Sequence, residues 1–174
     1  YIFLREKAAE GASAIIIGGG FIGSELAAVL SVNKVSVTMV FPSDYLCNRV
    51  LPPSLGLSVQ KDFIDRGIRV LANTTPTAIE QKGKEFFVST KERGVLESDI
   101  VVVGAGVAPS IELAEGALLK TGDGIEVDSR LCTSDPDVYS AGDAASFPYK
   151  ELGVRKRVEH WDNALEMGVA AASR

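Results

Sequence analysis

The sequence predicts an α/β protein built on a parallel β-sheet, and three segments near its start carry that prediction. Residues 14–17 (AIII) form a continuous apolar run, which is typical of a strand buried on both faces. Residues 21–32 place apolar side chains at helical spacing. Residues 35–40 (VSVTMV) alternate and are rich in β-branched side chains, as in a second strand. A strand, a helix and a strand in this order form a βαβ unit with parallel strands.

The flanking segments add further elements. The first ten residues predict the end of a helix, and residues 41–53, with three prolines, predict an irregular loop. Ser54 is the expected N-cap of a helix that runs to Arg66. Residues 68–71 predict another strand.

The second half of the chain changes character. Residues 77–98 carry short polar strands and glycine turns, which predict an antiparallel β-meander on the surface. Residues 99–103 (DIVVV) return to a buried strand. Further elements are expected as helices at 113–119 and 157–173, and as strands at 124–127 and 138–141. Trp161, Leu165 and Val169 lie four residues apart and predict an apolar face on the last helix.

Composition excludes several classes of protein. A chain of 174 residues allows one domain, or one domain and a fragment of a second. Cys47 and Cys132 lie too far apart in sequence for a C-x-x-C pair, and the single histidine cannot form a histidine-rich metal site. A net charge of −5 disfavours nucleic-acid binding, and no apolar run is long enough for a membrane span. Free thiols favour an intracellular compartment.

A glycine-rich loop follows the first strand. Gly18, Gly20 and Gly23 satisfy the pattern G-x-G-x-x-G between a strand and a helix, which is the context of a dinucleotide-binding, Rossmann-like domain. Gly18 permits the tight turn, Gly20 lets a pyrophosphate approach the backbone, and Gly23 lets the helix pack on the strand. The N-terminus of the helix then attracts the phosphates. The alternative is a glycine-rich turn that holds no ligand.

The nature of the dinucleotide depends on the loop after the second strand. An acidic residue that binds the adenosine ribose is expected about 20 residues beyond the glycines. Ser43 stands at that point, Asp44 follows it, and Arg49 lies further along. This pattern favours NAD, while NADP stays an alternative. Asp44 could also be only a turn residue after Pro42.

Four motifs follow one another in a fixed order: IIIGGGFIGSELA, IVVVGAGVAPSIELA, TSDPDVYSAGDAA and RKRVEHWDNAL. Together they resemble the motifs of the FAD-dependent pyridine-nucleotide oxidoreductases, above all the apoptosis-inducing-factor group, with ferredoxin reductases next. The resemblance implies that residues 1–10 end a helix of an FAD domain, residues 11–136 form an NAD(H)-binding domain, and residues 137–174 return to the FAD domain. The FAD-binding glycine loop and the C-terminal domain of such proteins are missing, so a chain that begins at Tyr1 is expected to be part of a longer protein.

The resemblance also implies roles for single residues in the NAD domain. Phe21 would lie beside the nicotinamide and the flavin, and Glu25 would sit near the nicotinamide and pair with a lysine of the missing half. Gly106 would place backbone groups against the nicotinamide end. Ser43 replaces the family's usual glutamate, and Arg49 corresponds to a lysine near the adenosine.

In the return segment, Asp143 would accept hydrogen bonds from the ribityl chain of FAD, and Glu159, His160 and Trp161 would line the flavin and the nicotinamide. Two simpler alternatives stay open: Asp143 could be a helix N-cap, and His160, Trp161 and Phe21 could be packed core residues. The basic run 155–157 is expected to be a solvated turn. The candidate cofactor-binding residues are therefore Gly18, Gly19, Gly20, Phe21, Ile22, Gly23, Glu25, Ser43, Asp44, Arg49, Gly104, Gly106, Asp143, Glu159, His160 and Trp161.

The expected function is an NAD(P)H-dependent flavoprotein oxidoreductase with FAD and NAD as cofactors. Because hydride passes between the cofactors, no catalytic side chain or metal ligand is expected. The electron acceptor could be a quinone or a ferredoxin-like protein, and the complete protein could be a dimer. The alternatives are a redox-gated signalling protein with low turnover and a flavin-free NAD-binding module. The compartment would be mitochondrial for an apoptosis-inducing-factor-like protein and otherwise cytoplasmic.

Overall fold

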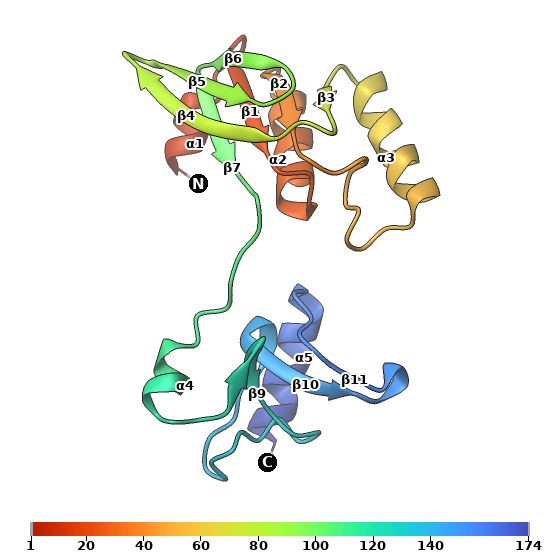
Figure 1. Ribbon diagram of the computed structural model, residues 1–174, viewed down its shortest axis with the longest axis vertical. Coiled ribbons are helices and arrows are strands. Elements are labelled where there is room, and N and C mark those ends of the chain that lie inside the picture. Colours follow the sequence, from red (N-terminus) through yellow and green to blue (C-terminus); the bar gives the residue numbers. More distant parts are fainter. Residues whose placement is uncertain (1, 174) are drawn as a thin grey trace. The chain divides into compact units, whose positions relative to one another are not determined.

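The computed structural model describes residues 2–173 and divides the chain into two compact units, which part between Gly106 and Val107. Tyr1 and Arg174, the outer ends of two predicted segments, lie outside the described residues. Figure 1 labels most of the helices and strands of the two units.

A four-stranded parallel sheet forms the centre of the first unit. Its strands are β1 (Ser13–Ile17), β2 (Ser36–Val40), β3 (Arg69–Leu71) and β7 (Ile100–Val103), in the order β3-β2-β1-β7. β1 pairs in parallel with both β2 and β7, and its residues 14–17 are buried. The predicted parallel sheet and its doubly buried first strand are confirmed.

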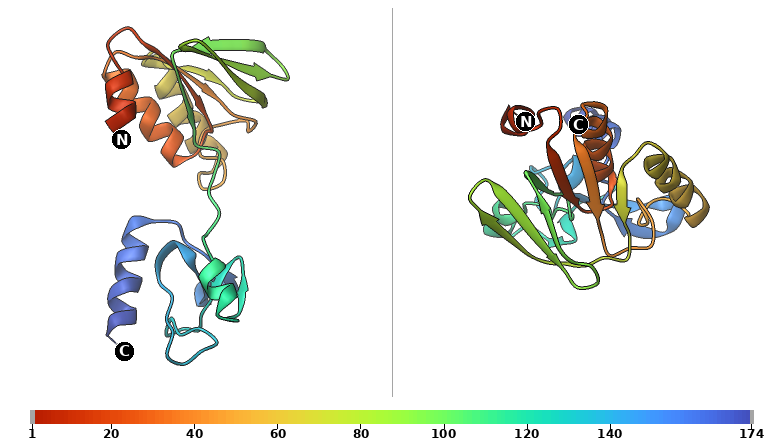
Figure 2. Two further views of the ribbon diagram at one scale, coloured as in Figure 1. Left: turned by 90° about the vertical axis from the view of Figure 1, so that its left-hand side faces the viewer. Right: turned by 90° about the horizontal axis from the view of Figure 1, so that it is seen from above.

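Alternating side chains of the strands serve two different layers. Ile16 and Met39 face the layer that contains α1 (Ile2–Lys7), α2 (Phe21–Val32) and α3 (Pro53–Asp65). Ile15 and Val40 point to the other face, where Val88 of the meander covers them. Figure 2 shows the helices on one side of the sheet and the meander on the other.

The meander consists of β4 (Pro76–Lys82), β5 (Glu85–Thr90) and β6 (Gly94–Ser98), which pair antiparallel as predicted. Gly83, with a φ of +65°, lies in the turn that connects β4 to β5. Val88 is fully buried, so the meander is also one wall of the core and not only a surface feature.

The start of α3 corrects one prediction. Pro52 is the N-cap residue and makes no side-chain capping bond, and Ser54 lies inside the first turn. Pro53 stands at the first helical position, where its fixed φ suits the helix and its missing N–H costs nothing. The helix therefore begins at Pro53, one residue before Ser54.

The second unit contains a small sheet and one long helix. The strands are β8 (Thr121–Gly122), β9 (Gly124–Glu126), β10 (Ala145–Tyr149) and β11 (Val154–Lys156), in the order β11-β10-β9-β8. The helical elements are α4 (Glu112–Gly116), η1 (Gly142–Ala144), η2 (Lys150–Leu152) and α5 (Trp161–Ala172). Val127, Leu131, Ala145 and Met167 form its core.

Several predictions for this unit are wrong. Residues 138–141 form no strand, because Tyr139 makes only an isolated bridge to Cys132. β10 and β11 were not expected. β9 pairs in parallel with β10. The compact units part between Gly106 and Val107, and the assignment of residues 11–136 and 137–174 to an NAD domain and an FAD domain stays a prediction.

The last helix also differs from its prediction. α5 begins at Trp161, not at Arg157. The predicted apolar face is solvent-exposed in this chain: Trp161 is 77% exposed, and Leu165 and Val169 are also exposed. Met167 points to the core instead.

Candidate functional site

The glycine loop lies where two parallel strands end and α2 begins. The backbone N–H of Gly18 donates to the carbonyl of Val40 at 2.9 Å. The N–H of Gly104 donates to the carbonyl of Ile17 at 2.7 Å. The loop is therefore fixed to the carboxyl ends of both β2 and β7, which is the edge where open parallel sheets bind ligands.

The three motif glycines have different surroundings. A Cβ atom at Gly18, whose φ is +123°, would lie 2.2 Å from the Gly104 carbonyl oxygen. A Cβ at Gly23 would lie 2.3 Å from the Gly18 carbonyl oxygen. A Cβ at Gly20 would meet no atom within 4 Å. Gly18 and Gly23 thus serve close packing, whereas Gly20 borders open space that a pyrophosphate could enter.

The first turn of α2 has the features of an anion site. Gly20 is the N-cap residue and provides no side chain to bond the first N–H groups of the helix. Phe21 and Ile22 are 54% and 58% exposed, and Glu25 is exposed as well. Phe21 therefore lies outside the core of this chain, and its contact with a cofactor stays a prediction.

Two residues that support the loop were missed by sequence reasoning. A Cβ at Gly19 would lie 2.8 Å from the ring of Phe41, which is buried directly after β2. The N–H of buried Cys47, whose φ is +55°, donates to the Gly19 carbonyl at 2.7 Å. The only available signal was the placement of Phe41 directly after the second strand.

The predicted adenosine residues lie in the loop after β2. Ser43 is half-buried, and its hydroxyl donates to the carbonyl of Tyr45 at 3.3 Å. The N–H of Asn73 donates to the Ser43 carbonyl at 3.0 Å, which fixes the backbone there. Asp44 and Arg49 are exposed. A selective role for these three side chains stays a prediction.

The turn after β7 contains the other predicted residues of the first unit. Gly104 is half-buried against Gly23, which a Cβ at Gly104 would approach to 3.6 Å. Gly106 has a φ of +125°, and a Cβ there would meet no atom within 4 Å. The backbone at Gly106 is therefore open to a ligand, as the predicted nicotinamide contact requires.

In the second unit, Asp143 lies in η1 with an exposed side chain. The preceding Gly142 is buried with a φ of +76°, and a Cβ there would lie 3.2 Å from the Cβ of Ala164 on α5. The glycine lets the turn seat directly on the helix. Because Ala141 is the N-cap residue of η1, the alternative of Asp143 as an N-cap is wrong.

Glu159, His160 and Trp161 lie at the start of α5 and are all exposed. His160 is the N-cap residue, and its Nδ1 accepts a hydrogen bond from the N–H of Asp162 at 3.2 Å. Glu159 therefore precedes the helix and is not part of its first turn. The alternative of packed core residues is wrong for His160 and Trp161 in this chain.

The basic run 155–157 is not a turn, because Arg155 and Lys156 lie in β11; these two residues are exposed as predicted, whereas Arg157 is not. Nη1 of Arg155 donates to the carbonyls of Val127 and Ser146. The side chain of Arg157 is only 12% exposed and contacts two carboxylates. Its pKa is raised, first by the hydrogen bond to Asp123 and then by the bond to Glu159, while burial opposes the rise.

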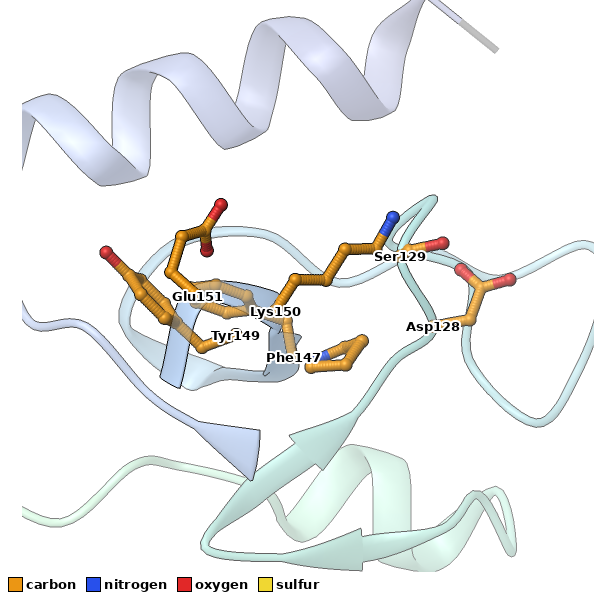
Figure 3. A pocket seen from close by; sticks show the side chains of 7 residues that line it. Asp128, Ser129, Phe147, Tyr149, Lys150 and Glu151 are labelled. Carbon is orange, nitrogen blue, oxygen red and sulfur yellow. The ribbon is translucent and has the colours of Figure 1, made fainter. Parts of the chain in front are cut away.

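A hollow of about 320 Å³ lies in the second unit. Figure 3 shows the side chains that line it. Its lining residues are Asp128, Ser129, Phe147, Pro148, Tyr149, Lys150 and Glu151. None of these residues belongs to the predicted cofactor site. Across residues 2–173, no cluster of side chains suited to a metal ion is present. Within the same range, no helix is both long and apolar enough to cross a bilayer.

The fold and the glycine loop define a dinucleotide-binding α/β protein, and comparison with known proteins gives its family. Residues 2–168 match the model of the pyridine nucleotide-disulphide oxidoreductases, and the chain belongs to this family. FAD and NAD(P)H are the cofactors of this family. The predicted fold class and the predicted family are confirmed.

The similar curated proteins include two plant enzymes. Peroxisomal monodehydroascorbate reductase 4 of Arabidopsis thaliana is 39% identical over 163 residues, which are 92% of this chain and 33% of the relative. Peroxisomal monodehydroascorbate reductase 2 of Oryza sativa subsp. japonica is 40% identical over 161 residues, or 91% of this chain and 34% of the relative. The chain therefore spans about a third of the curated relatives it matches.

Solved structures agree with this assignment. The ferredoxin reductase for the CYP199A2 system from Rhodopseudomonas palustris has a TM-score of 0.93 and 33% identity, covering 99% of this chain and 43% of its own. Putidaredoxin reductase, in its covalent complex with putidaredoxin, has a TM-score of 0.92 and 27% identity. The match covers 98% of this chain and 42% of the reductase chain. These relatives do not support the narrower prediction of an apoptosis-inducing-factor-like protein.

Proposed function

We propose that this chain supplies the NAD(H) site and one wall of the FAD site of an NAD(P)H-dependent flavoprotein reductase. The observation that carries the proposal is the open space beside Gly20, at the start of α2, in a chain of this family. A Cβ at Gly18 or Gly23 would meet backbone atoms, whereas at Gly20 the same direction is open, which supports the approach of a phosphate there.

The residues present fit both cofactors. The first-turn N–H groups of α2 would bind the pyrophosphate of NADH, Ser43 and Arg49 would contact the adenosine end, and Gly106 the nicotinamide end. In the second unit, Asp143 would accept hydrogen bonds from the ribityl chain, and His160 and Trp161 would border the ring system. The chemistry that FAD would supply when bound is the uptake of hydride from the nicotinamide and the onward transfer of electrons. The protein's own part is to bind, orient and exclude water.

For the electron acceptor, we propose monodehydroascorbate first and a ferredoxin-like protein second. The first follows from the names of relatives that are 39% and 40% identical, and the second from the ferredoxin reductase at 33% identity. Two peroxisomal relatives make the peroxisome a compartment to test before the mitochondrion, together with the cytoplasm that was expected from the sequence. The family match extends through Asp143 and His160, which speaks against a flavin-free NAD-binding module.

The absorbance of the complete protein tests this proposal. We expect flavin bands in the purified protein and their bleaching by NADH without oxygen. NADH oxidation is then followed with monodehydroascorbate, with a ferredoxin and with a quinone as acceptors. A protein without flavin, or a flavin that NADH does not reduce, would contradict the proposed function. If only the quinone supported turnover, the proposal of a flavoprotein reductase would stand, and both proposed acceptors would be rejected.

A further inference from the structure

One guanidinium joins three separate segments of the second unit. Nε of Arg157 donates to Oδ1 of Asp123 at 2.8 Å, in the turn between β8 and β9. Nη1 donates to the carbonyl of Asp143 at 2.8 Å and to Oε1 of Glu159 at 2.9 Å. The side chain is 12% exposed, in contrast to the partners in surface ion pairs such as Lys34–Glu10, which are 70% and 71% exposed.

The backbone around Arg157 is shaped to receive its side chain. Gly124 has a φ of +95°, and a Cβ there would lie 2.5 Å from Cδ of Arg157 and 2.6 Å from the Ala144 carbonyl oxygen. Any other residue at position 124 would displace the arginine stem or the turn that carries Asp143. This packing is independent of the ion pairs and points to a fixed place for the guanidinium.

We infer that Arg157 is a positioning residue for the cofactor site of the second unit. The inference rests on the proposed function, because it takes Asp143, Glu159 and His160 as residues that face the flavin. Arg157 holds the backbone of Asp143 and the carboxylate of Glu159 on one planar group. It thereby sets the distance between the Gly-Asp turn and the segment that leads to His160.

Two physical effects follow from this arrangement. First, a site that is ordered before the cofactor arrives loses less conformational entropy on binding. Second, the positive charge of Arg157 balances the carboxylates of Asp123 and Glu159. Without it, Glu159 would place an uncompensated negative charge beside the flavin, which disfavours the electron-rich reduced ring.

The test compares four variants of the complete protein. Arg157→Gln removes the charge and the forked donors, and Arg157→Lys keeps only the charge. Arg155→Gln is the matched control, because Arg155 is a neighbouring arginine whose Nη1 donates to the carbonyls of Val127 and Ser146, away from the predicted flavin residues. Lys156→Gln controls for loss of charge at an exposed position.

Three measurements separate positioning from stability. Hydrogen exchange of the FAD-free protein reports the order of residues 142–145 and 158–162. Titration with FAD gives its affinity, and the flavin spectrum and reduction potential report the charge beside the ring. We expect Arg157→Gln to speed exchange in both segments, to weaken FAD binding at least tenfold and to lower the potential. Arg157→Lys should recover the potential more than the affinity.

Arg155→Gln should lower the melting temperature and leave the spectrum and the potential unchanged. If Arg157→Gln does not fold, Asp123→Asn replaces it, because the Asp123 side chain is 75% exposed and its loss frees one anchor of Arg157. Arg157→Gln or Asp123→Asn behaving like Arg155→Gln would overturn the inference. A wild-type complete protein that binds no FAD would instead overturn the proposed function, and hydrogen exchange would still report the order that Arg157 imposes.

Discussion

Gly18 lies so close to Gly104 that a Cβ on Gly18 would stand 2.2 Å from the Gly104 carbonyl oxygen. Two backbone segments from distant parts of the chain therefore touch at the glycine loop. We expect Gly18→Ala to destabilise the first unit by about 2–5 kcal/mol, through the clash and the φ of +123°. Urea denaturation measures the change. A loss below about 0.5 kcal/mol would show that this contact relaxes easily.

Gly20→Val, unlike Gly18→Ala, should leave the protein folded but abolish the binding of NADH. The position is exposed, and a Cβ added there would have no atom within 4 Å, so the fold tolerates the change. The branched side chain would keep the pyrophosphate from the first amides of α2. Gly116→Val is the control, since Gly116 has an equally open Cβ direction in the second unit. NADH titration decides, and unchanged affinity would remove Gly20 from the phosphate site.

Ser43→Glu should sharpen the preference for NADH over NADPH. A carboxylate there would repel the 2′-phosphate of NADPH, while the Asn73–Ser43 backbone bond would be kept. We expect the ratio of the two kcat/KM values to rise about tenfold, which corresponds to about 1.4 kcal/mol. Ser54→Glu, on exposed α3, serves as control. An unchanged ratio would place residue 43 outside the adenosine pocket.

His160 has a capping role that can be separated from its predicted flavin contact. His160→Ala should lower stability by about 1 kcal/mol, because the N–H of Asp162 loses its acceptor. His160→Asn should keep the cap, since Asn is among the best N-cap residues. If His160 also contacts the flavin, both variants reduce the flavin more slowly in stopped-flow experiments. If the flavin of His160→Asn were reduced at the wild-type rate, the role of His160 would be limited to capping the helix.

Asp99 makes the first unit sensitive to acid. The hydroxyl and the N–H of Ser13 both donate to Asp99 Oδ2, at 2.7 and 2.8 Å, and these bonds lower the pKa of Asp99. The pKa of an aspartate in the unfolded chain is about 3.9, and a carboxylate whose pKa is lower in the folded protein contributes its full stabilisation at any pH above that value. The contribution is lost as the pH falls below about 3.9 and through the lower pKa of the folded protein.

Ser13→Ala should therefore destabilise at pH 7 by less than about 1 kcal/mol, because the carboxylate is exposed. The difference from wild type should shrink below pH ~4. Ser36→Ala is the control, because Ser36 is the residue of β2 that lies opposite Ser13 in the pairing of β1 with β2. Unfolding midpoints measured from pH 6 to pH 2.5 would contradict the assignment if the difference stayed constant.

The sequence predicted those parts of the fold in which local signals agree with the final packing. Residues 21–32 were expected as a helix and form α2 with the same bounds, because the glycines before it set its start. The parallel sheet followed from β-branched runs that are buried on both faces. Gly18, Gly20 and Gly23 likewise have the surroundings that their motif predicts. Their binding roles stay predictions.

The second unit was harder to predict because its contacts depend on distant partners. β10 and β11 are short and half polar; β10 pairs with β9 and β11 pairs with β10, so neither strand is indicated by a pattern of its own. Arg157 looked like a solvated residue because its partners, Asp123 and Asp143, lie 34 and 14 residues away. No local pattern in the sequence reveals that an arginine is enclosed by segments so far from it.

The position of β1 between β2 and β7 imposes an order on folding. β1 and β2 can pair as soon as Val40 has left the ribosome, but the other edge of β1 has no partner until Ile100 follows. The bonds between Ser13 and Asp99 join residues 86 apart, and such contacts form slowly. Until then an apolar strand edge stays open to other chains. Because Gly18 lies against Gly104, the glycine loop is complete only after β7 has paired with β1, and we expect nucleotide to bind only a chain that has closed this sheet.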